Sequence, residues 1–364
     1  MTGPAKNLIG FARQARPQVD LAVVTYRRPS APEEELLPAL AAAGVPFRVI
    51  DEAGMADPRV MPRLLALFRA ERPDIIQTHN TKSHFLMRLT AASRRTPWIA
   101  FHHGFTNRDR KDRFYNRLSR WAMKGADRVV AVCDAFATDL RACGVAPQRI
   151  FIRHNFVLPF TAPAAAEVEA LRTQLAIPAG TRVIVAVGRL SREKGHADLL
   201  EALARLQSAG PLSDFRLVIV GEGPERTNLE RRREALRLGG IVLLAGHQPN
   251  VRPFYGLADM VVLPSHSEGS PNVLLEAMSA GLPIVATNAG GTGEIAVDGQ
   301  TAMLVPLRDP RALAEGIRKI WTDPELARRL GMRARAVAAQ FTPDAYAESM
   351  IGLYRSLLAS RAEG

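Results

Sequence analysis

The sequence predicts an α/β protein with two doubly wound domains on either side of a cleft. Its 364 residues exceed one ordinary domain and suit two. In both halves, short β-branched runs alternate with amphipathic helical stretches. A Pro- and Ala-rich segment at 158–166 separates the halves and is typical of a linker. We therefore expect one domain at 1–157 and a second at 166–342, with a C-terminal helix at 343–364 that packs back on the first domain.

The expected elements follow in chain order. The strands predicted in the first half are Leu21–Thr25, Phe47–Ile50, Ile75–Thr78, Trp98–Phe101, Val129–Val132 and Ile150–Arg153. Helical patterns lie near 33–43, 61–71, 82–94, 109–124 and 134–142. The strands predicted in the second half are Val183–Val187, Leu217–Val220, Val242–Leu244, Met260–Leu263 and Ile284–Ala286. Only a helical pattern at 5–15 precedes the first strand, so either the true start lies upstream or this domain is built without the usual opening strand.

The net charge of the chain is concentrated in the first half. Residues 1–157 contain 25 Lys and Arg against 14 Asp and Glu, a net charge of +11, whereas residues 158–364 contain 23 against 22, a net charge of +1. Such a basic half favours an anionic partner, which could be nucleic acid, an anionic membrane or a phosphorylated lipid.

The sequence also bears on the cellular compartment. No apolar stretch reaches the roughly 20 residues needed to span a bilayer, and the N-terminus lacks the apolar run of a signal peptide. Cys133 and Cys143 have neither metal-binding nor redox spacing, so we expect two buried free thiols. We predict a cytoplasmic protein that can also associate peripherally with the inner face of the membrane.

The strongest chemical signal is a pair of glutamates, Glu268 and Glu276, around the start of a predicted helix. Free N–H groups at a helix N-terminus suit a phosphate, and ligands of open α/β sheets bind at the carboxyl ends of the strands. We expect Glu276 to accept hydrogen bonds from ribose hydroxyls and Glu268 to lie in the loop above the strand end. Two glutamates at this spacing can also mark a solvated helix face, but Gly269 and Pro271 between them favour a site.

Residues 268–276 read E-G-S-P-N-V-L-L-E and match the E-x7-E element of the family 4 glycosyltransferases. Segments 187–195, 221–225, 277–287 and 290–294 are similar to that family as well, in the expected order. The first half resembles it more weakly, through His79, His103-Gly104 and residues 149–155.

The resemblance implies a GT-B fold and transfer of a sugar from a nucleoside-diphosphate donor with retention of the anomeric configuration. It also implies that Arg189 and Lys194 clamp the donor diphosphate and that Glu268 helps to orient the hexose. The expected donor-binding residues are Gly188, Arg189, Lys194, Gly269, Ser270, Asn272, Val273, Leu274 and Glu276. In such proteins a Gly-rich turn after the opening strand faces the phosphates, and only Gly3 remains of that turn here.

The histidines allow one further assignment. His103 follows a predicted strand and resembles the family histidine that hydrogen-bonds the donor sugar, so we expect His103 and Glu268 to be the catalytic residues. One alternative is that His103 only forms structural hydrogen bonds at the edge of the domain. Another is that His102, and not His103, corresponds to the family histidine. We expect no role for His154 or His266, nor for the His79 noted above.

A basic stripe marks the predicted helix at 109–124. Arg110, Arg113, Arg117, Arg120 and Lys124 repeat at three- and four-residue spacing and share one helical face. Phe114, Leu118, Trp121 and Ala122 form an adjacent apolar stripe. One interpretation is a helix that docks on an anionic membrane near a lipid-linked acceptor. The other is an ordinary domain helix whose apolar stripe is core and whose arginines are solvated.

The predicted reaction needs no metal and no cofactor. No Asp-x-Asp occurs, so the metal-dependent GT-A alternative lacks its ligand motif. No residue is an obvious dedicated base, which fits a front-face route in which the departing phosphate oxygen takes the acceptor proton. The expected donor is a UDP- or GDP-type sugar, and the expected acceptor is a cell-envelope glycan, polysaccharide or lipid-linked molecule. We expect loops 27–33 and 105–112 to select the acceptor.

Other functions remain open. An epimerase or phosphorylase on the same fold, or a non-catalytic nucleotide-sugar-binding protein, is an alternative, and the missing opening strand favours the last of these. We expect no nucleic-acid partner, because no recognisable nucleic-acid module accompanies the arginines.

Overall fold

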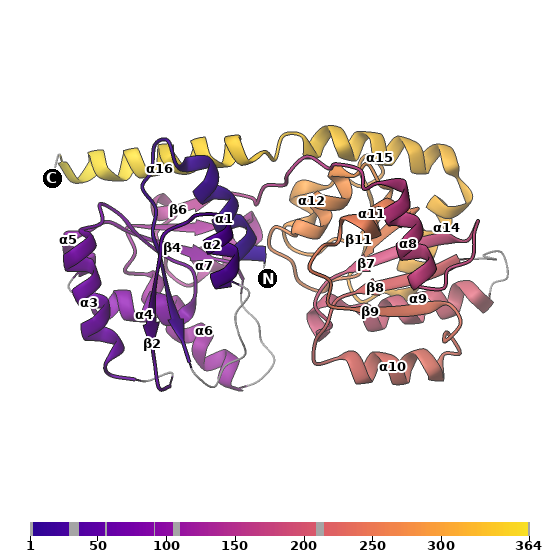
Figure 1. The fold of residues 1–364 in the computed structure, drawn as a ribbon, viewed down its shortest axis with the longest axis horizontal. Helices are drawn as coiled ribbons and strands as arrows, with labels where there is room; N and C mark the ends of the chain where they lie inside the picture. The colour runs from indigo at the N-terminus through magenta and orange to yellow at the C-terminus, as the bar shows by residue number, and fades with distance from the viewer. Residues whose placement is uncertain are drawn as a thin grey trace. The chain divides into compact units, whose positions relative to one another are not determined.

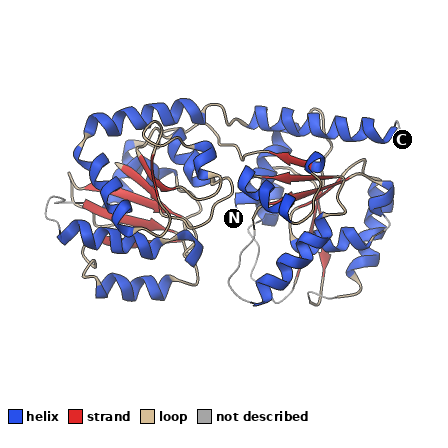
Figure 2. Ribbon diagram, turned by 180° about the vertical axis from the view of Figure 1, so that it is seen from behind, coloured by secondary structure: helices blue, strands red, loops and turns tan. Residues whose placement is uncertain are grey.

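The computed structural model describes residues 3–28, 36–54, 57–90, 92–104, 110–208 and 215–362. The chain divides into two compact units, unit 1 (residues 1–155 and 343–364) and unit 2 (residues 156–342). In each unit, parallel strands lie between helices (Figures 1 and 2). The prediction of an α/β protein built from two Rossmann-like halves is confirmed.

Unit 1 contains two parallel sheets among its described residues. One pairs β1 with β2, and the other has the strand order β3-β4-β5-β6. The strands are β1 Val23–Arg27, β2 Phe47–Asp51, β3 Ile76–Thr78, β4 Trp98–His102, β5 Arg128–Ala131 and β6 Ile150–Ile152. Their ends agree with the predicted ends to within two residues, because each is a short apolar run between polar turns. Every residue of β4 is buried, as is typical of a central parallel strand.

The helices of unit 1 flank these strands. They are α1 Gly3–Ala15, α2 Leu36–Ala42, α3 Val60–Glu71, α4 Thr81–Leu89, α5 Ala92–Arg95, α6 Arg110–Met123, α7 Asp134–Ala142 and α16 Pro343–Ala362, with a 3-10 turn η1 at Pro147–Arg149. The helix predicted at 82–94 is divided into α4 and α5. A capping box fixes the start of α4, since the Asn80 side chain accepts from Ser83 N at 2.9 Å and Asn80 N donates to Ser83 Oγ at 3.2 Å.

The C-terminal helix α16 packs against α1, as predicted. The Phe11 ring meets the rings of Tyr346 and Tyr354 edge-on, at centroid distances of 5.9 and 6.1 Å. All three side chains are buried, so this aromatic cluster holds the last helix on the first unit (Figure 1).

Unit 2 is built on one six-stranded parallel sheet of order β12-β11-β10-β7-β8-β9. The strands are β7 Arg182–Val187, β8 Phe215–Val220, β9 Val242–Gly246, β10 Met260–Leu263, β11 Ile284–Thr287 and β12 Met303–Val305. The first five were predicted. β12 was not predicted, because three apolar residues give too short a pattern to distinguish a strand from a loop.

The helices of unit 2 include one in an unexpected place. They are α8 Ala165–Gln174, α9 His196–Ser208, α10 Arg226–Ala235, α11 Arg252–Leu257, α12 Asn272–Ser279, α13 Thr292–Ile295, α14 Pro310–Thr322 and α15 Pro324–Ala338, with a 3-10 turn η2 at Arg192–Lys194. Helix α8 begins inside the expected linker. In the same segment, the backbone N–H of Phe160 donates a hydrogen bond to Ser279 Oγ at 2.9 Å, which attaches the segment to α12. The segment is grouped with unit 2, at its boundary with unit 1, and residues 158–164 form neither helix nor strand, so a linker at 158–166 stays a prediction.

The two cysteines differ from each other. Cys133 is buried and Cys143 is half-buried, and both are free thiols. The expectation of two buried thiols is right for Cys133 and wrong for Cys143, which lies at the C-terminal end of α7.

Candidate functional site

The two strongest sequence motifs meet at one edge of the unit 2 sheet. Residues 187–195 follow β7 and residues 264–276 follow β10, and these two strands are paired in the sheet, with Val185 opposite Val261. Because both strands are parallel, their carboxyl ends lie side by side and bring the two loops together. This is the place where open α/β sheets bind ligands.

Lys194 and Glu268, which are 74 residues apart, form the centre of this region. Lys194 Nζ lies 2.6 Å from Glu268 Oε1, and Ser265 Oγ donates to the same oxygen at 2.6 Å. The lysine side chain is 28% exposed and the glutamate side chain 10% exposed. Glu268 Oε2 has no hydrogen-bond partner within the described part of the chain, so the carboxylate is held in place by one oxygen and can accept from a ligand with the other.

Two glycines allow the loops to approach this closely. Gly195 has φ +65°, and a Cβ there would lie 1.9 Å from the carbonyl oxygen of Pro264. Gly290 has φ +50°, and a Cβ there would lie 2.1 Å from the carbonyl oxygen of Glu268. Any side chain at either position would push apart the loops that hold Lys194 and Glu268.

Glu276 lies on α12 and is oriented by a residue that the sequence analysis missed. The hydroxyl of Tyr255 on α11 donates to Glu276 Oε2 at 2.8 Å. Tyr255 is 3% exposed, and burial, together with the Glu276 carboxylate, raises its pKa well above the usual value. The tyrosine is therefore a permanent donor that fixes the glutamate. Sequence spacing carries no signal for it, because 21 residues and a strand separate the two.

The remaining residues that were predicted to bind the donor have different surroundings. Arg189 is exposed, and its guanidinium forms no hydrogen bond or ion pair within the ranges described. Gly188, Gly269, Asn272 and Val273 are half-buried and Ser270 is buried. Leu274 is fully buried in a core cluster, and its N–H donates to Pro271 O at 3.1 Å. The Leu274 side chain thus belongs to the core rather than to a ligand surface.

His196, at the start of α9, is a second residue that the sequence analysis missed. It is 3% exposed, and burial lowers its pKa to about 4, with a smaller effect from the nearby Lys194 charge. The ring is therefore neutral at pH 7. A Cβ on Gly188 would lie 3.7 Å from His196 Nε2, so the ring lies directly beneath the turn that carries Arg189.

A pocket adjoins this turn on the side of α9. It is lined by Ser191, Gly195 and His196 together with three cationic side chains, Arg192, Arg232 and Arg308. Lys194, Glu268 and Glu276 do not line it. Lys194, Glu268 and Glu276, which were predicted to bind the donor, therefore lie at the loops above the sheet edge and outside this pocket.

In unit 1, the predicted His103 lies beside His79. The two follow β4 and β3, and His79 Nδ1 lies 3.3 Å from His103 Nε2. His79 also stacks on Phe101 at a centroid distance of 4.4 Å. Burial lowers the pKa of His103 to about 4 and that of His79 well below its usual value, so both rings are neutral at pH 7. His79, to which the sequence analysis assigned no role, is thus the hydrogen-bond partner of the candidate catalytic histidine.

The alternative His102 has another environment. It is 3% exposed and packs against Phe136, and burial lowers its pKa to about 3. His103, by contrast, lines a small cavity of unit 1 together with His79 and Gln77, whose Oε1 and the Nε2 of His79 are buried without a partner in the described ranges. His103 is therefore the histidine of the pair that can reach a ligand.

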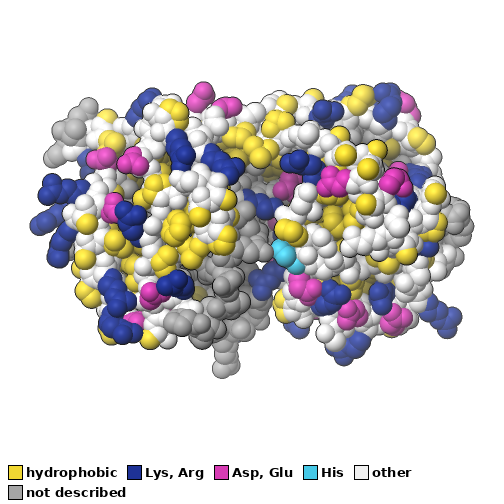
Figure 3. Space-filling model, in the orientation of Figure 1, with side chains coloured by type: hydrophobic (Ala, Val, Ile, Leu, Met, Phe, Trp, Pro, Cys, Tyr) yellow, Lys and Arg dark blue, Asp and Glu magenta, His cyan; other side chains and the backbone are white. Residues whose placement is uncertain are grey.

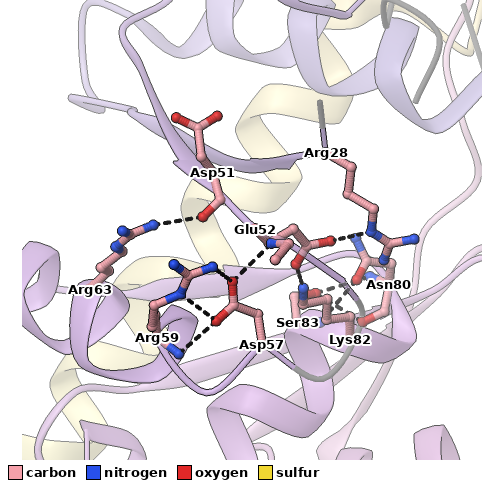
Figure 4. Close-up of polar contacts among 10 residues, drawn as sticks. Arg28, Asp51, Glu52, Asp57, Arg59, Arg63, Asn80, Lys82 and Ser83 are labelled. Carbon is pink, nitrogen blue, oxygen red and sulfur yellow. Dashed lines mark hydrogen bonds and ion pairs between the residues drawn. The ribbon is translucent and has the colours of Figure 1, made fainter. Parts of the chain in front are cut away.

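Unit 1 also holds a network of ion pairs at the carboxyl ends of β1 and β2 (Figure 4). Glu52 is 4% exposed, accepts from Arg28 Nε at 2.8 Å and forms an ion pair with Lys82 at the start of α4. Burial and the neighbouring Arg28 charge lower the pKa of Lys82. Next to it, Asp57 accepts from the Arg59 guanidinium and from Ala53 N, which lowers its pKa. The network fixes the chain after β2 against α4, and no motif in the sequence pointed to it.

The other predicted positions are placed as follows. Gly3 is the first residue of α1 and lies within the helix rather than in a preceding turn. On α6, Arg113 and Arg117 are exposed and Arg120 is half-buried, and Lys124 is exposed in the turn that follows the helix. The side chain of Arg110 lies outside the described part of the structure, and so do residues 29–33 and 105–109 of the loops expected to select the acceptor.

Two family models match the chain and together cover most of it. The model described as Glycosyltransferase Family 4 matches residues 5–158, and the model described as Glycosyl transferases group 1 matches residues 167–337.

Curated relatives are similar over about half of the chain. The lipopolysaccharide core biosynthesis glycosyltransferase LpsE of Rhizobium meliloti is 34% identical over 191 residues, which is 52% of this chain and 53% of LpsE. The D-inositol 3-phosphate glycosyltransferase of Corynebacterium jeikeium is 36% identical over 206 residues, which is 54% of this chain and 49% of that protein. The chain thus spans about half the length of these curated relatives.

Solved structures are similar over almost the whole chain. Anabaena Alr3699/HepE in complex with UDP and glucose has a TM-score of 0.85 at 20% identity, covering 98% of this chain and 96% of that one. The lipopolysaccharide outer core galactosyltransferase WaaB in its apo form has a TM-score of 0.73 at 16% identity, covering 99% and 96%. At such low identity the likeness shows the fold alone. The likeness shows that the chain has the GT-B fold, and the two family matches show that it belongs to the family 4 glycosyltransferases.

Proposed function

We propose that this protein transfers a sugar from a nucleoside-diphosphate donor to a glycan or lipid-linked acceptor of the cell envelope, with retention and without a metal ion. The observation that carries the proposal is the contact between Lys194 and Glu268 beside the exposed Arg189. It places two cations and an oriented carboxylate at the sheet edge where a nucleotide sugar is expected.

The cations suit the charge that develops during transfer. As the bond between the sugar and the diphosphate breaks, negative charge grows on the leaving phosphate, and positively charged groups already in place stabilise it. Arg189 can bind the phosphate as a bidentate donor. Lys194 already lies near its working position because Glu268 holds it, so little reorganisation is needed. Since these two cations supply the stabilisation, the proposed reaction requires no metal.

The carboxylates suit donor orientation. Glu276 has a fixed position, because Tyr255 donates to one of its oxygens, and it is proposed to accept from the ribose hydroxyls. Glu268 is proposed to accept from a hydroxyl of the transferred sugar through Oε2. His103 belongs to unit 1, and its proposed hydrogen bond to the sugar rests on the family resemblance and on a neutral ring that can donate.

Relatives and structural neighbours favour particular substrates. The bound UDP and glucose in Anabaena Alr3699/HepE favour a UDP-sugar over a GDP-sugar as the donor. The names of LpsE and WaaB favour a lipopolysaccharide-type acceptor. Retention follows from the family resemblance, and a front-face route fits a site whose candidate groups hold phosphate and sugar but include no obvious dedicated base.

Donor binding provides the first test. The purified full chain is titrated with UDP, GDP and a panel of their sugars by calorimetry, and thermal unfolding is followed in parallel. We expect one nucleotide to bind, and Lys194→Ala and Glu276→Ala to weaken that binding at least about tenfold. Lys319→Ala on α14 and Glu325→Ala on α15 are the controls, because both side chains are exposed in the same unit.

Transfer is tested next, with radiolabelled donor and a membrane extract as the acceptor source. Label is expected in the lipid or glycan fraction, and it should persist in the presence of a chelator. The anomeric configuration of the linked sugar is then read from proton NMR. Binding of no nucleotide would contradict the proposal, and release of an altered free sugar without acceptor would assign the chain to the epimerase alternative.

A further inference from the structure

Helix α6 exposes two large aromatic side chains, while its opposite face is buried. Phe114 is 64% exposed and Trp121 is 45% exposed, whereas Asn116, Ser119, Ala122 and Met123 are buried. An ordinary surface helix shows the reverse pattern, with its large apolar residues in the core. Of the two interpretations of this helix, the one in which the aromatic stripe is core does not hold for Phe114 and Trp121.

The exposed aromatic side chains lie among cations. The positions of Phe114, Arg117 and Trp121 are separated by three and four residues, so the three side chains share one face of α6. Arg113 lies at the margin of this face, and Lys124 lies in the turn that directly follows the helix. Arg113, Arg117 and Lys124 are exposed. The single carboxylate in α6, Asp112, lies on the opposite side of the helix by the same geometry.

Helix α4 extends this surface. The two helices pack against each other, the Phe85 ring lies 6.1 Å from the Trp121 ring, and the Arg88 guanidinium lies over Trp121 at 5.5 Å. The absence of a side chain at Gly125 leaves room for Arg88, since a Cβ there would lie 2.0 Å from its Nη1. Helix α4 contains no Asp or Glu. We call the residues Arg88, Arg113, Phe114, Arg117, Trp121 and Lys124 the α4–α6 surface.

We propose that the α4–α6 surface binds an anionic lipid bilayer. Exposed aromatic side chains on a basic helix match the interface between head groups and acyl chains, where the rings enter the apolar layer and the cations reach lipid phosphates. Charge complementarity favours this occupant, because four cations surround the two rings and, within the described parts of α4 and α6, no carboxylate lies on the same face. Figure 3 shows one face of the molecule, on which apolar, basic and acidic side chains of unit 1 are exposed.

This surface uses none of the residues assigned to the donor. All six of its residues belong to unit 1, whereas Arg189, Lys194, Glu268 and Glu276 belong to unit 2. Among the described residues no helix is both long and apolar enough to span a bilayer. The proposed attachment is a surface contact, and it can hold or fail independently of the transfer activity.

The tryptophans of the chain supply a direct readout. Of the three, Trp98 is 0% and Trp321 is 7% exposed, so Trp121 is the one that solvent reaches. Adding phosphatidylglycerol-containing vesicles to the full chain should shift tryptophan emission to shorter wavelength, and brominated lipid should quench it. Neither effect is expected with pure phosphatidylcholine vesicles, or in Trp121→Phe, which keeps an aromatic ring but removes the reporter.

Charge reversal then tests the cations. Each Lys or Arg near an anionic surface contributes about fivefold to the partition coefficient, so Arg113→Glu with Arg117→Glu and Lys124→Glu should lower vesicle binding at least about 100-fold in a flotation assay. The matched control reverses Arg311, Arg318 and Lys319, which are exposed on α14 of unit 2. Thermal unfolding and donor titration of both variants show that each is folded and binds nucleotide as the original chain does.

Three outcomes would overturn the proposal. The first is equal binding of the original chain and the reversed α6 variant to anionic vesicles. The second is a dimer in sedimentation that Phe114→Ser with Trp121→Ser dissociates, since the surface would then belong to a second copy. The third is binding of single-stranded RNA at the same salt concentration with an affinity that exceeds that for vesicles. Loss of vesicle binding with intact donor binding supports the surface, whereas loss of donor binding with intact vesicle binding contradicts only the proposed transferase function.

Discussion

Replacing Tyr255 with Phe removes a single oxygen atom that orients the glutamate proposed to hold the ribose. The lost hydrogen bond is 2.8 Å long and ends on a carboxylate, and its donor is 3% exposed. Hydrogen bonds to charged groups contribute about 1.5–3 kcal/mol. The phenylalanine ring fills the same space, so no large cavity forms. We expect the free energy of unfolding to fall by about 1–2 kcal/mol, because water can partly replace the donor at a half-buried carboxylate.

The effect on donor affinity is the more informative quantity. If Glu276 binds the ribose only when Tyr255 fixes it, then Tyr255→Phe should weaken nucleotide binding roughly tenfold, which corresponds to about 1.4 kcal/mol. Calorimetry measures this with nucleotide and nucleotide sugar, and urea unfolding measures stability separately. Tyr26→Phe, which removes a partly buried hydroxyl from β1 in unit 1, is the control. Unchanged affinity alongside reduced stability would refute the reasoning, because Glu276 would then be a structural partner of Tyr255 and not a ribose acceptor.

Three further predictions concern stability. The unfolded chain protonates histidine below about pH 6.5, whereas folded His196, whose pKa burial lowers to about 4, stays neutral to lower pH. The unfolding free energy should therefore fall as the pH drops from 6.5 to 4, and His196→Gln should flatten this dependence in unfolding titrations. Gly195→Ala should cost about 2 kcal/mol or more and weaken nucleotide binding, because its Cβ meets Pro264 O, whereas Gly299→Ala, at a similar φ of +66° with open space around it, should cost only about 1 kcal/mol. Glu52→Gln should lower the unfolding free energy by about 1–3 kcal/mol, because two cations then face a neutral group; an unchanged urea midpoint would show that water already screens them.

The elements that the sequence predicted well are those whose pattern is local. The strands of both units are continuous apolar runs, and a parallel strand buried on both faces leaves such a run wherever the chain folds in this way. The glutamate motif was also recognisable locally, because its glycine, proline and helix start are contiguous. β12 and α8 escaped because three apolar residues and an alanine-rich segment carry almost no periodic signal.

The contacts that give the site its chemistry are not local. Lys194 and Glu268 come together only because β7 and β10 are neighbours in the sheet. Along the chain, two strands and three helices separate β7 from β10. The apolar pattern of a sequence does not determine the order of the strands in a sheet. The same reason explains why Tyr255 and His196 were missed, since each acquires its role from a residue or turn on another element.

The α6 helix shows a different limit of periodicity. Its amphipathic pattern was read correctly from the sequence, but periodicity alone cannot say which face meets the protein. An apolar stripe is buried by default, because burying a large side chain such as Phe or Trp stabilises the fold by about 1.5–3 kcal/mol. Here the face of α6 that carries Ser119, Ala122 and Met123 is buried, whereas the Phe114 and Trp121 side chains stay exposed. Retaining an exposed Phe114 and Trp121 forgoes that stabilisation, and binding to an apolar interface is the simplest way for the molecule to recover it.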